Sequence, residues 1–122
     1  MKPILLVATS DAEQSRRFYS AIPGLNFVED QSHALVFDSG GYQLRVQKVE
    51  KVVTQPYTAA GWEVDDIETL VADLAAKGLA MEHYPFLEQD ELGIWTTPDG
   101  AKIAWFLDPD GNVLSFTQFP GE

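Results

Sequence analysis

Few residues of this chain have the type and spacing that chemistry requires. The sequence contains two histidines, His33 and His83, and no cysteine. Histidine titrates near neutral pH, so these two residues are the candidate general bases. His83 is the better catalytic candidate because it precedes a long stretch between predicted elements, whereas His33 begins a strand beside a turn. The absence of cysteine excludes disulfides, thiolate zinc sites and cysteine nucleophiles.

A polar row alternates with apolar residues in the strand predicted over 42–48. This alternation places Gln43, Arg45 and Gln47 on one face of the strand. An arginine is suited to clamp a carboxylate or a phosphate. The alternative is that Arg45 pairs with Glu63 or reaches solvent, and that the glutamines line an exposed sheet face. Both interpretations stay open.

Aromatic and acidic residues occur together in the stretch 83–95, which could stack on and neutralise a cationic ligand. The alternative is a solvated acidic loop with one packing tryptophan. We expect the other two tryptophans, Trp62 and Trp105, to belong to the core. The candidate ligand-binding residues are therefore Gln43, Arg45, Gln47, Glu63, Tyr84, Trp95 and Ser115.

The charge of the chain is distributed unevenly. The net charge of −11 arises from eight basic and nineteen acidic residues, and all of the excess lies in residues 57–122. A basic surface is needed to bind phosphate backbones, so we expect no nucleic-acid partner. The longest apolar run, residues 4–8, is too short to span a bilayer, and no signal peptide is recognisable. We expect a cytoplasmic protein with no membrane partner.

Hydrophobic patterning predicts that each half of the chain contains one strand, one helix and then three strands. Each helix follows a capping-box pattern, at residues 10–13 and 65–68, and the second helix ends at Gly78. The first helix should run to about Ala21. The predicted strands cover residues 3–9, 25–29, 33–38, 42–48, 58–64, 80–84, 101–108 and 113–118.

The two halves of the sequence overlay on each other. The capping box at 10–13 aligns with that at 65–68, and positions 37–44 align with 107–114 without a gap. The additional residues of the second half fall mostly between 85 and 100, where an insertion typically forms a loop over a binding face. We predict a single domain over 1–122, with module 1 at about 1–50 and module 2 at about 57–119.

These motifs resemble the vicinal-oxygen-chelate superfamily, which includes glyoxalase I, bleomycin-resistance proteins and extradiol dioxygenases. The resemblance is carried by Phe18-Tyr19, by Ile22-Pro23-Gly24-Leu25 and by the segment from Trp105 to Asn112. It implies an α+β fold in which two βαβββ modules form a curled eight-stranded mixed sheet around a cleft, with the helices outside. It also implies a homodimer.

The resemblance further implies where a metal would be bound. Metal-dependent relatives use one position on the first and last strand of each module, typically histidine or glutamate. The matching positions here hold Ile4, Arg45, Ala59 and Ser115. Divalent metals need imidazole or carboxylate ligands, so we expect no metal, no cofactor and no metal-dependent glyoxalase I activity.

Three functional hypotheses remain open. The first is a protein that binds a small molecule in the cleft without a metal, comparable to drug-sequestering relatives of the bleomycin type. The second is a lyase, isomerase or dioxygenase that uses no metal or an unconventional metal site built from His83, Glu63 and Glu82. The third is a regulatory or partner-binding domain without catalysis.

Overall fold

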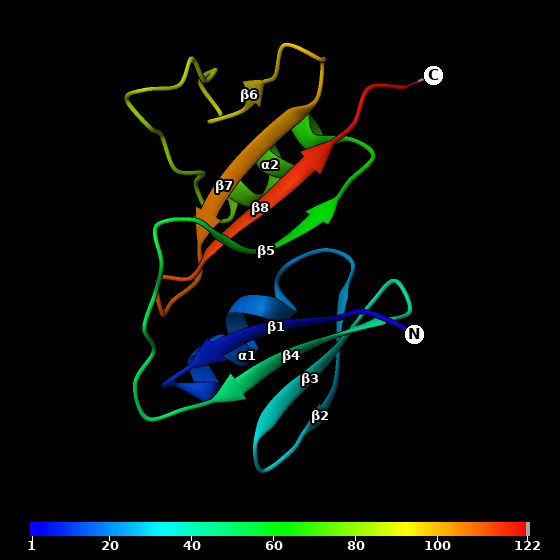
Figure 1. The fold of residues 1–122 in the computed structure, drawn as a ribbon, viewed down its shortest axis with the longest axis vertical. Helices are drawn as coiled ribbons and strands as arrows, with labels where there is room; N and C mark the ends of the chain where they lie inside the picture. The colour runs from blue at the N-terminus through cyan, green and yellow to red at the C-terminus, as the bar shows by residue number, and fades with distance from the viewer. Residues whose placement is uncertain (122) are drawn as a thin grey trace. The chain divides into compact units, whose positions relative to one another are not determined.

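The chain contains eight strands and two helices, as shown by a computed structural model that describes residues 1–121 (Figure 1). It divides into two compact units: unit 1 is residues 1–60 with 108–112, and unit 2 is residues 61–107 with the segment from 113 onward. The elements are β1 (Ile4–Thr9), α1 (Ala12–Ser20), β2 (Leu25–Asp30), β3 (Ala34–Ser39), β4 (Tyr42–Lys48), β5 (Thr58–Glu63), α2 (Ile67–Ala76), β6 (Trp95–Thr96), β7 (Lys102–Leu107) and β8 (Val113–Gln118).

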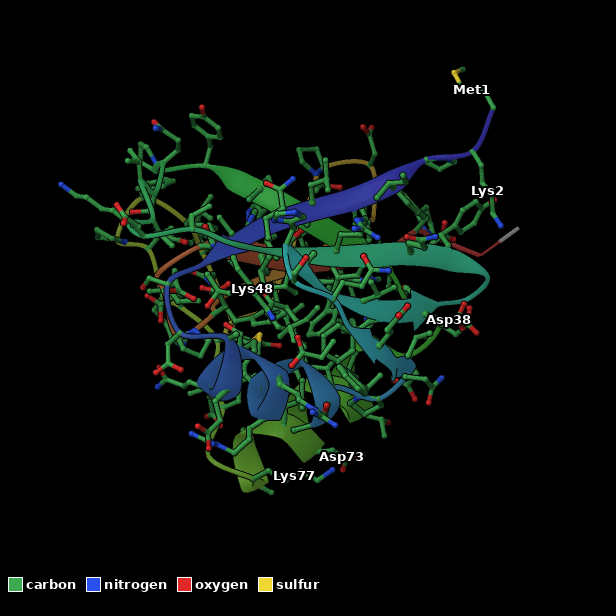
Figure 2. All side chains as sticks on the ribbon, turned by 90° about the horizontal axis from the view of Figure 1, so that it is seen from below. Met1, Lys2, Asp38, Lys48, Asp73 and Lys77 are labelled. Carbon is green, nitrogen blue, oxygen red and sulfur yellow. The ribbon has the colours of Figure 1, made fainter. Side chains whose placement is uncertain are left out.

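Unit 1 is a four-stranded mixed sheet with the order β1-β4-β3-β2. Strand β1 runs parallel to β4, and the other neighbours are antiparallel. Helix α1 lies on one side of the sheet, where Tyr19 packs against Phe37 at 5.9 Å between ring centroids (Figure 2). Phe37, Leu44 and Val46 are fully buried, so this face of the sheet forms the core of the unit.

Unit 2 repeats the order with the sheet β5-β8-β7-β6. Its core is formed by side chains of α2, β7 and β8, and its large members that are fully or almost fully buried are Ile67, Val71, Leu74, Phe106, Leu114 and Phe116. The predicted α+β class with two βαβββ modules is confirmed. That the modules form one domain around a shared cleft stays a prediction.

The strand predicted over 80–84 is wrong. These residues form no strand, and the second strand of unit 2 is instead the two-residue β6, at the end of the long insertion. Glu82 still donates its backbone N–H to the Trp105 carbonyl, at 2.7 Å. Pro85 follows soon afterwards and has no N–H to continue a ladder, which is consistent with the chain leaving the sheet there.

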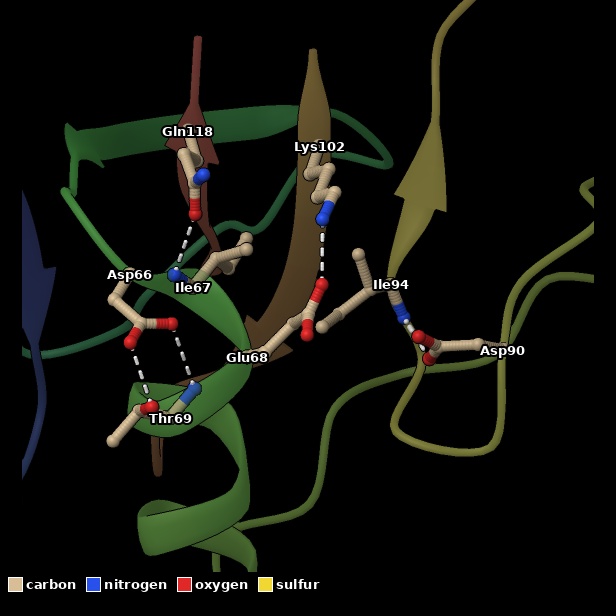
Figure 3. A network of polar contacts seen from close by, with 8 residues as sticks. All are labelled: Asp66, Ile67, Glu68, Thr69, Asp90, Ile94, Lys102 and Gln118. Carbon is tan, nitrogen blue, oxygen red and sulfur yellow. Dashed lines mark hydrogen bonds and ion pairs between the residues drawn. The ribbon is translucent and has the colours of Figure 1, made fainter. Parts of the chain in front are cut away.

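Both helices begin one residue later than the capping boxes predict. Asp11 accepts a hydrogen bond from the Gln14 backbone N–H, and Asp66 accepts one from the Thr69 backbone N–H and another from its hydroxyl (Figure 3). An aspartate at the N-cap satisfies a helix N–H that has no partner within the helix. Asp11 and Asp66 occupy equivalent positions of the two capping boxes, so the internal repeat holds at this point.

The predicted overlay of the last hairpins without a gap is wrong by one residue. Phe37 faces Leu44 across the hairpin of unit 1, whereas Phe106 faces Leu114 across that of unit 2. All four side chains are fully buried. Leu44 therefore corresponds to Leu114, as the overlay requires. Phe37 corresponds to Phe106 rather than to Leu107, so the second turn contains one additional residue.

That longer turn, the loop 108–112, is grouped with unit 1 although its flanking strands belong to unit 2. The buried carboxylate of Asp108 accepts hydrogen bonds from the Tyr19 hydroxyl at 2.5 Å and from the Asn112 side chain at 2.8 Å. Asn112 also donates to the Ala8 carbonyl, and Asp110 accepts from Ser10. Sequence patterning identified this segment only as a turn.

Candidate functional site

In unit 1 the candidate residues lie on the sheet face opposite α1. Arg45 is the register neighbour of Leu6 on β1 and of Val36 on β3. Gln43 and Gln47 are exposed on this face, while the alternate residues of β4 are buried in the core. The predicted alternation of β4 is confirmed.

A chain of polar contacts crosses this face. Arg45 donates from Nη2 to Gln31 Oε1 at 2.9 Å and from Nη1 to Gln43 Oε1 at 3.2 Å. The Gln31 amide nitrogen donates to the Glu29 carboxylate at 3.1 Å. A guanidinium on one side and a carboxylate on the other determine the orientation of the Gln31 amide, since its oxygen can only accept and its nitrogen can only donate. Gln31 was missed by the sequence analysis.

A hollow of about 280 Å³ opens at the end of this face. Its lining is His33, Ala34, Arg45, Gln47, Lys48 and Val49. Lys48 lies at the last position of β4 (Figure 2). Its ammonium group donates to the Asp30 carboxylate and to the Gln31 carbonyl. The hollow therefore has a cationic lining, and it includes His33, the weaker of the two histidine candidates.

In unit 2 four aromatic side chains form one connected group, which we call the aromatic cluster: Tyr84, Phe86, Trp95 and Trp105. The ring of Trp105 stacks on that of Trp95 with centroids 6.2 Å apart, and Tyr84 meets Trp105 edge-on at 5.7 Å. Tyr84 and Phe86 stack at 5.6 Å, and Phe86 is 78% exposed. These separations are typical of favourable aromatic pairs.

The expectation that Trp105 belongs to the core is wrong. Its neighbours along β7, Ala104 and Phe106, are fully buried, so alternation places Trp105 on the opposite face. That face is shared with Ser115, its register partner on β8. The same alternation was available in the sequence. Trp62, by contrast, packs against the core residue Phe116, as predicted.

The loop that carries most of the cluster is organised by one amide side chain. Gln89 accepts from the Tyr84 backbone N–H at 2.6 Å and donates to the carbonyls of Glu82 and Gly93. Asp90 accepts from the backbone N–H of Ile94 at 2.9 Å (Figure 3). Two residues of the predicted acidic loop thus bind the loop's own backbone. Neither role was identified from the sequence.

The remaining candidates of unit 2 differ in exposure. Ser115 is 8% exposed, and a Cβ placed on Gly61 would lie 2.5 Å from its hydroxyl oxygen, so a side chain at that position of β5 would displace this hydroxyl. Glu63 lies two residues further along β5 and is exposed. Partial burial, and then the nearby Glu82 carboxylate, raise the pKa of Tyr84, so its phenol is neutral near pH 7. His83 is exposed, and its catalytic role stays a prediction.

The residues at the family's metal positions do not fit a metal ion. Ile4 and Ala59 carry no donor atom, Arg45 presents a positive charge, and the hydroxyl of Ser115 is buried beside Gly61. Divalent metals in such sites need imidazole or carboxylate ligands. Residues 1–121 also contain no group of three or more histidine and acidic side chains placed to hold a metal ion.

The chain belongs to the Glyoxalase/Bleomycin resistance protein/Dioxygenase superfamily, whose family model matches residues 3–116. This match covers nearly all of the chain and confirms the resemblance stated from the motifs. A comparison with curated protein sequences finds no match. No helix within residues 1–121 is long and apolar enough to cross a membrane.

Solved structures with the same fold have varied activities. A lactoylglutathione lyase from Agrobacterium tumefaciens is similar with a TM-score of 0.74 and 15% identity, covering 97% of this chain and 92% of that one. The fosfomycin resistance protein FosX from Listeria monocytogenes has a TM-score of 0.76 and 11% identity, covering 98% and 93%. The oxidase ChaP-H2 has a TM-score of 0.74 and 24% identity, covering 98% and 94%. At these identities the likeness shows the fold alone.

Proposed function

We propose that this protein binds a small planar aromatic molecule and does so without a metal ion at the family's ligand positions. The aromatic cluster of unit 2 is the observation that carries the proposal. Trp95 and Trp105 are only partly buried, and they lie on the sheet face that the core does not use. Aromatic surface left partly exposed beside polar residues is typical of ligand sites.

The geometry of the cluster favours a flat ligand. Two of its three ring contacts are close to parallel, with interplanar angles of 30° and 29°. A planar ring can extend such a stack, and each aromatic pair contributes about 0.5–1.5 kcal/mol beyond its burial. Gln89 fixes the loop that carries Tyr84, so part of the ordering cost of binding is already met.

A fluorescence titration tests the proposal. Two planar probes, proflavine as a cation and anthracene-9-carboxylate as an anion, separate stacking from charge. We expect at least one of them to quench tryptophan emission saturably, with a Kd on the order of 10 µM. The Trp95→Ala variant should bind about tenfold more weakly, since one stacking contact is lost.

Trp62→Phe is the matched control, because Trp62 packs on the core side of the sheet. It removes one tryptophan but should leave the affinity unchanged. Linear, non-saturating quenching by both probes, or equal affinity of Trp95→Ala and the wild type, would contradict the proposal.

The proposal retains two expectations from the sequence: a homodimeric state and a cytoplasmic location. Light scattering coupled to size-exclusion chromatography tests the first. The expected result is a mass twice that of the 13.5 kDa chain, and the mass of a single chain contradicts it.

A further inference from the structure

The hollow of unit 1 contains a positive charge that unit 1 does not neutralise. Arg45 is half-buried, and its two hydrogen bonds go to the amide oxygens of Gln31 and Gln43 rather than to a carboxylate. No acidic residue of unit 1 forms an ion pair with it. An indirect link to an acid runs from Arg45 through the Gln31 side-chain amide to the Glu29 carboxylate. A partly desolvated charge without a counter-ion is costly unless a partner supplies one.

The guanidinium retains donors for such a partner. An arginine has five N–H donors in a planar fork, and the two glutamines use two of them. The remaining donors match the planar, two-oxygen geometry of a carboxylate. The two glutamines orient the guanidinium but, being neutral, do not neutralise its charge. The group is therefore oriented before any ligand binds.

The charges around the hollow indicate a ligand group with a single negative charge. Lys48 also lines the hollow, but its ammonium group is paired with Asp30 and the Gln31 carbonyl. The pair contributes no net charge, and Arg45 is the remaining cation of the lining. Gln47 and His33, also in the lining, supply further hydrogen-bonding groups. A carboxylate carries one negative charge, whereas phosphate near neutral pH carries up to two.

We propose that the hollow lined by His33, Arg45, Gln47 and Lys48 binds the carboxylate group of a small molecule. Arg45 makes the contact through its unused N–H donors. This inference goes beyond the proposed function, which concerns the aromatic cluster of unit 2. The carboxylate contact itself depends only on residues of unit 1.

The test is a titration of the isotope-labelled protein with sodium acetate, followed by NMR. The Arg45 side-chain Nε–H and the backbone amides of the hollow are the reporters. Sodium chloride at the same ionic strength is the blank, and inorganic phosphate is the second probe. We expect a saturable shift confined to these reporters with a Kd of about 1–10 mM, the weak range expected of so small a probe.

Two variants at Arg45 and one control define the specificity. Arg45→Gln should weaken acetate binding about tenfold or more, and Arg45→Lys should weaken it severalfold because the planar fork is lost. Arg17→Gln is the matched control, since Arg17 carries the same charge on α1, is 67% exposed and pairs with Glu13. It should bind acetate as the wild type does. Arg45→Lys keeps the test decisive if Arg45→Gln does not fold.

Each other outcome overturns the proposal. These outcomes are shifts equal to those caused by chloride, shifts spread over reporters outside the hollow, and undiminished acetate binding by Arg45→Lys. Phosphate saturating at tenfold lower concentration than acetate overturns the carboxylate assignment. Tryptophan quenching reports on unit 2 and the acetate shifts report on unit 1, so failure of this inference is distinguishable from failure of the proposed function.

Discussion

At the scale of single residues, Asp108 and Tyr19 form a buried polar contact of unit 1. The Asp108 carboxylate accepts four hydrogen bonds, from the Tyr19 hydroxyl, the Asn112 side chain and the backbone of Asp110 and Asn112. Burial, and then the charge of Asp108, raise the pKa of Tyr19 above its usual value, so its hydroxyl remains a donor. Buried charges are tolerated when they are hydrogen-bonded in this way.

Replacing Tyr19 by phenylalanine tests this contact. Tyr19→Phe removes one donor from a buried carboxylate, and we expect the free energy of unfolding to fall by about 2 kcal/mol in urea denaturation. Tyr42→Phe is the control, since Tyr42 is 47% exposed, and it should change stability by less than about 0.5 kcal/mol. Equal effects of the two variants would show that the Asp108 contact contributes nothing.

Asp110 should make stability depend on pH. Burial alone would raise its pKa, but hydrogen bonds from the Ser10 backbone and from the hydroxyls of Thr9, Ser10 and Ser15 lower it overall. A pKa lowered by folding adds stability above the unfolded value, about 4, and this stability is lost as the pH falls through the folded value. The stability difference between wild type and Asp110→Asn should therefore be constant above about pH 5 and shrink below about pH 4. A constant difference down to acid pH would contradict this assignment.

At the scale of elements, the helices and the long loop depend on a few side-chain acceptors. Asp11 caps α1, so Asp11→Ala should lower the free energy of unfolding by about 1 kcal/mol, because a helix N–H loses its acceptor. Asp11→Asn should retain most of the stability, since asparagine caps equally well. Urea denaturation of both variants measures the difference, and an equal loss in the two would indicate that charge rather than capping is responsible.

The insertion of unit 2 should depend on Gln89 in the same way. Gln89→Leu removes three hydrogen bonds and leaves the carbonyls of Glu82 and Gly93 without this donor. We expect disorder of the loop, a reduced near-UV circular dichroism signal from the stacked tryptophans and loss of proflavine quenching. Glu88→Ala, at the exposed neighbouring position, should alter none of these. A normal tryptophan signal in Gln89→Leu would show that the aromatic cluster forms independently of the loop contacts.

At the scale of the whole molecule, the fold was predictable because both halves of the sequence encode the same order of helices and strands. Strands β4 and β8 begin and end where alternation predicts, and the caps of the two helices obey the internal repeat. Strand β6 was missed because a two-residue strand has no periodicity, and its partner β7 lies beyond a loop held by side chains. The hairpin overlay was one residue off because a turn can gain a residue without changing the pattern of either strand.

The candidate site was predictable only in part, for a related reason. Alternation places Arg45 and its glutamines correctly, since it depends on one strand alone. Gln31 and Gln89 lie outside the helices and strands, where the sequence has no periodicity. They act through hydrogen bonds to Arg45, 14 positions away, and to Glu82, 7 positions away, and no local pattern encodes such contacts. Trp105 is different, because alternation along β7 was sufficient to place it on the face opposite the core.

The loop 108–112 makes the turns of two equivalent hairpins, β3–β4 and β7–β8, unequal as sites for engineering. In the turn of unit 1, a Cβ on Gly40 or Gly41 would meet no atom within 4 Å, and both residues are exposed. A peptide tag inserted there has room. The same tag inserted after Asp110 would displace the partners of Tyr19, Ser10 and the Ala8 carbonyl. The two turns occupy corresponding positions of the repeat, but we expect only the turn at Gly40 and Gly41 to tolerate an insertion. It is therefore the suitable place to attach a label.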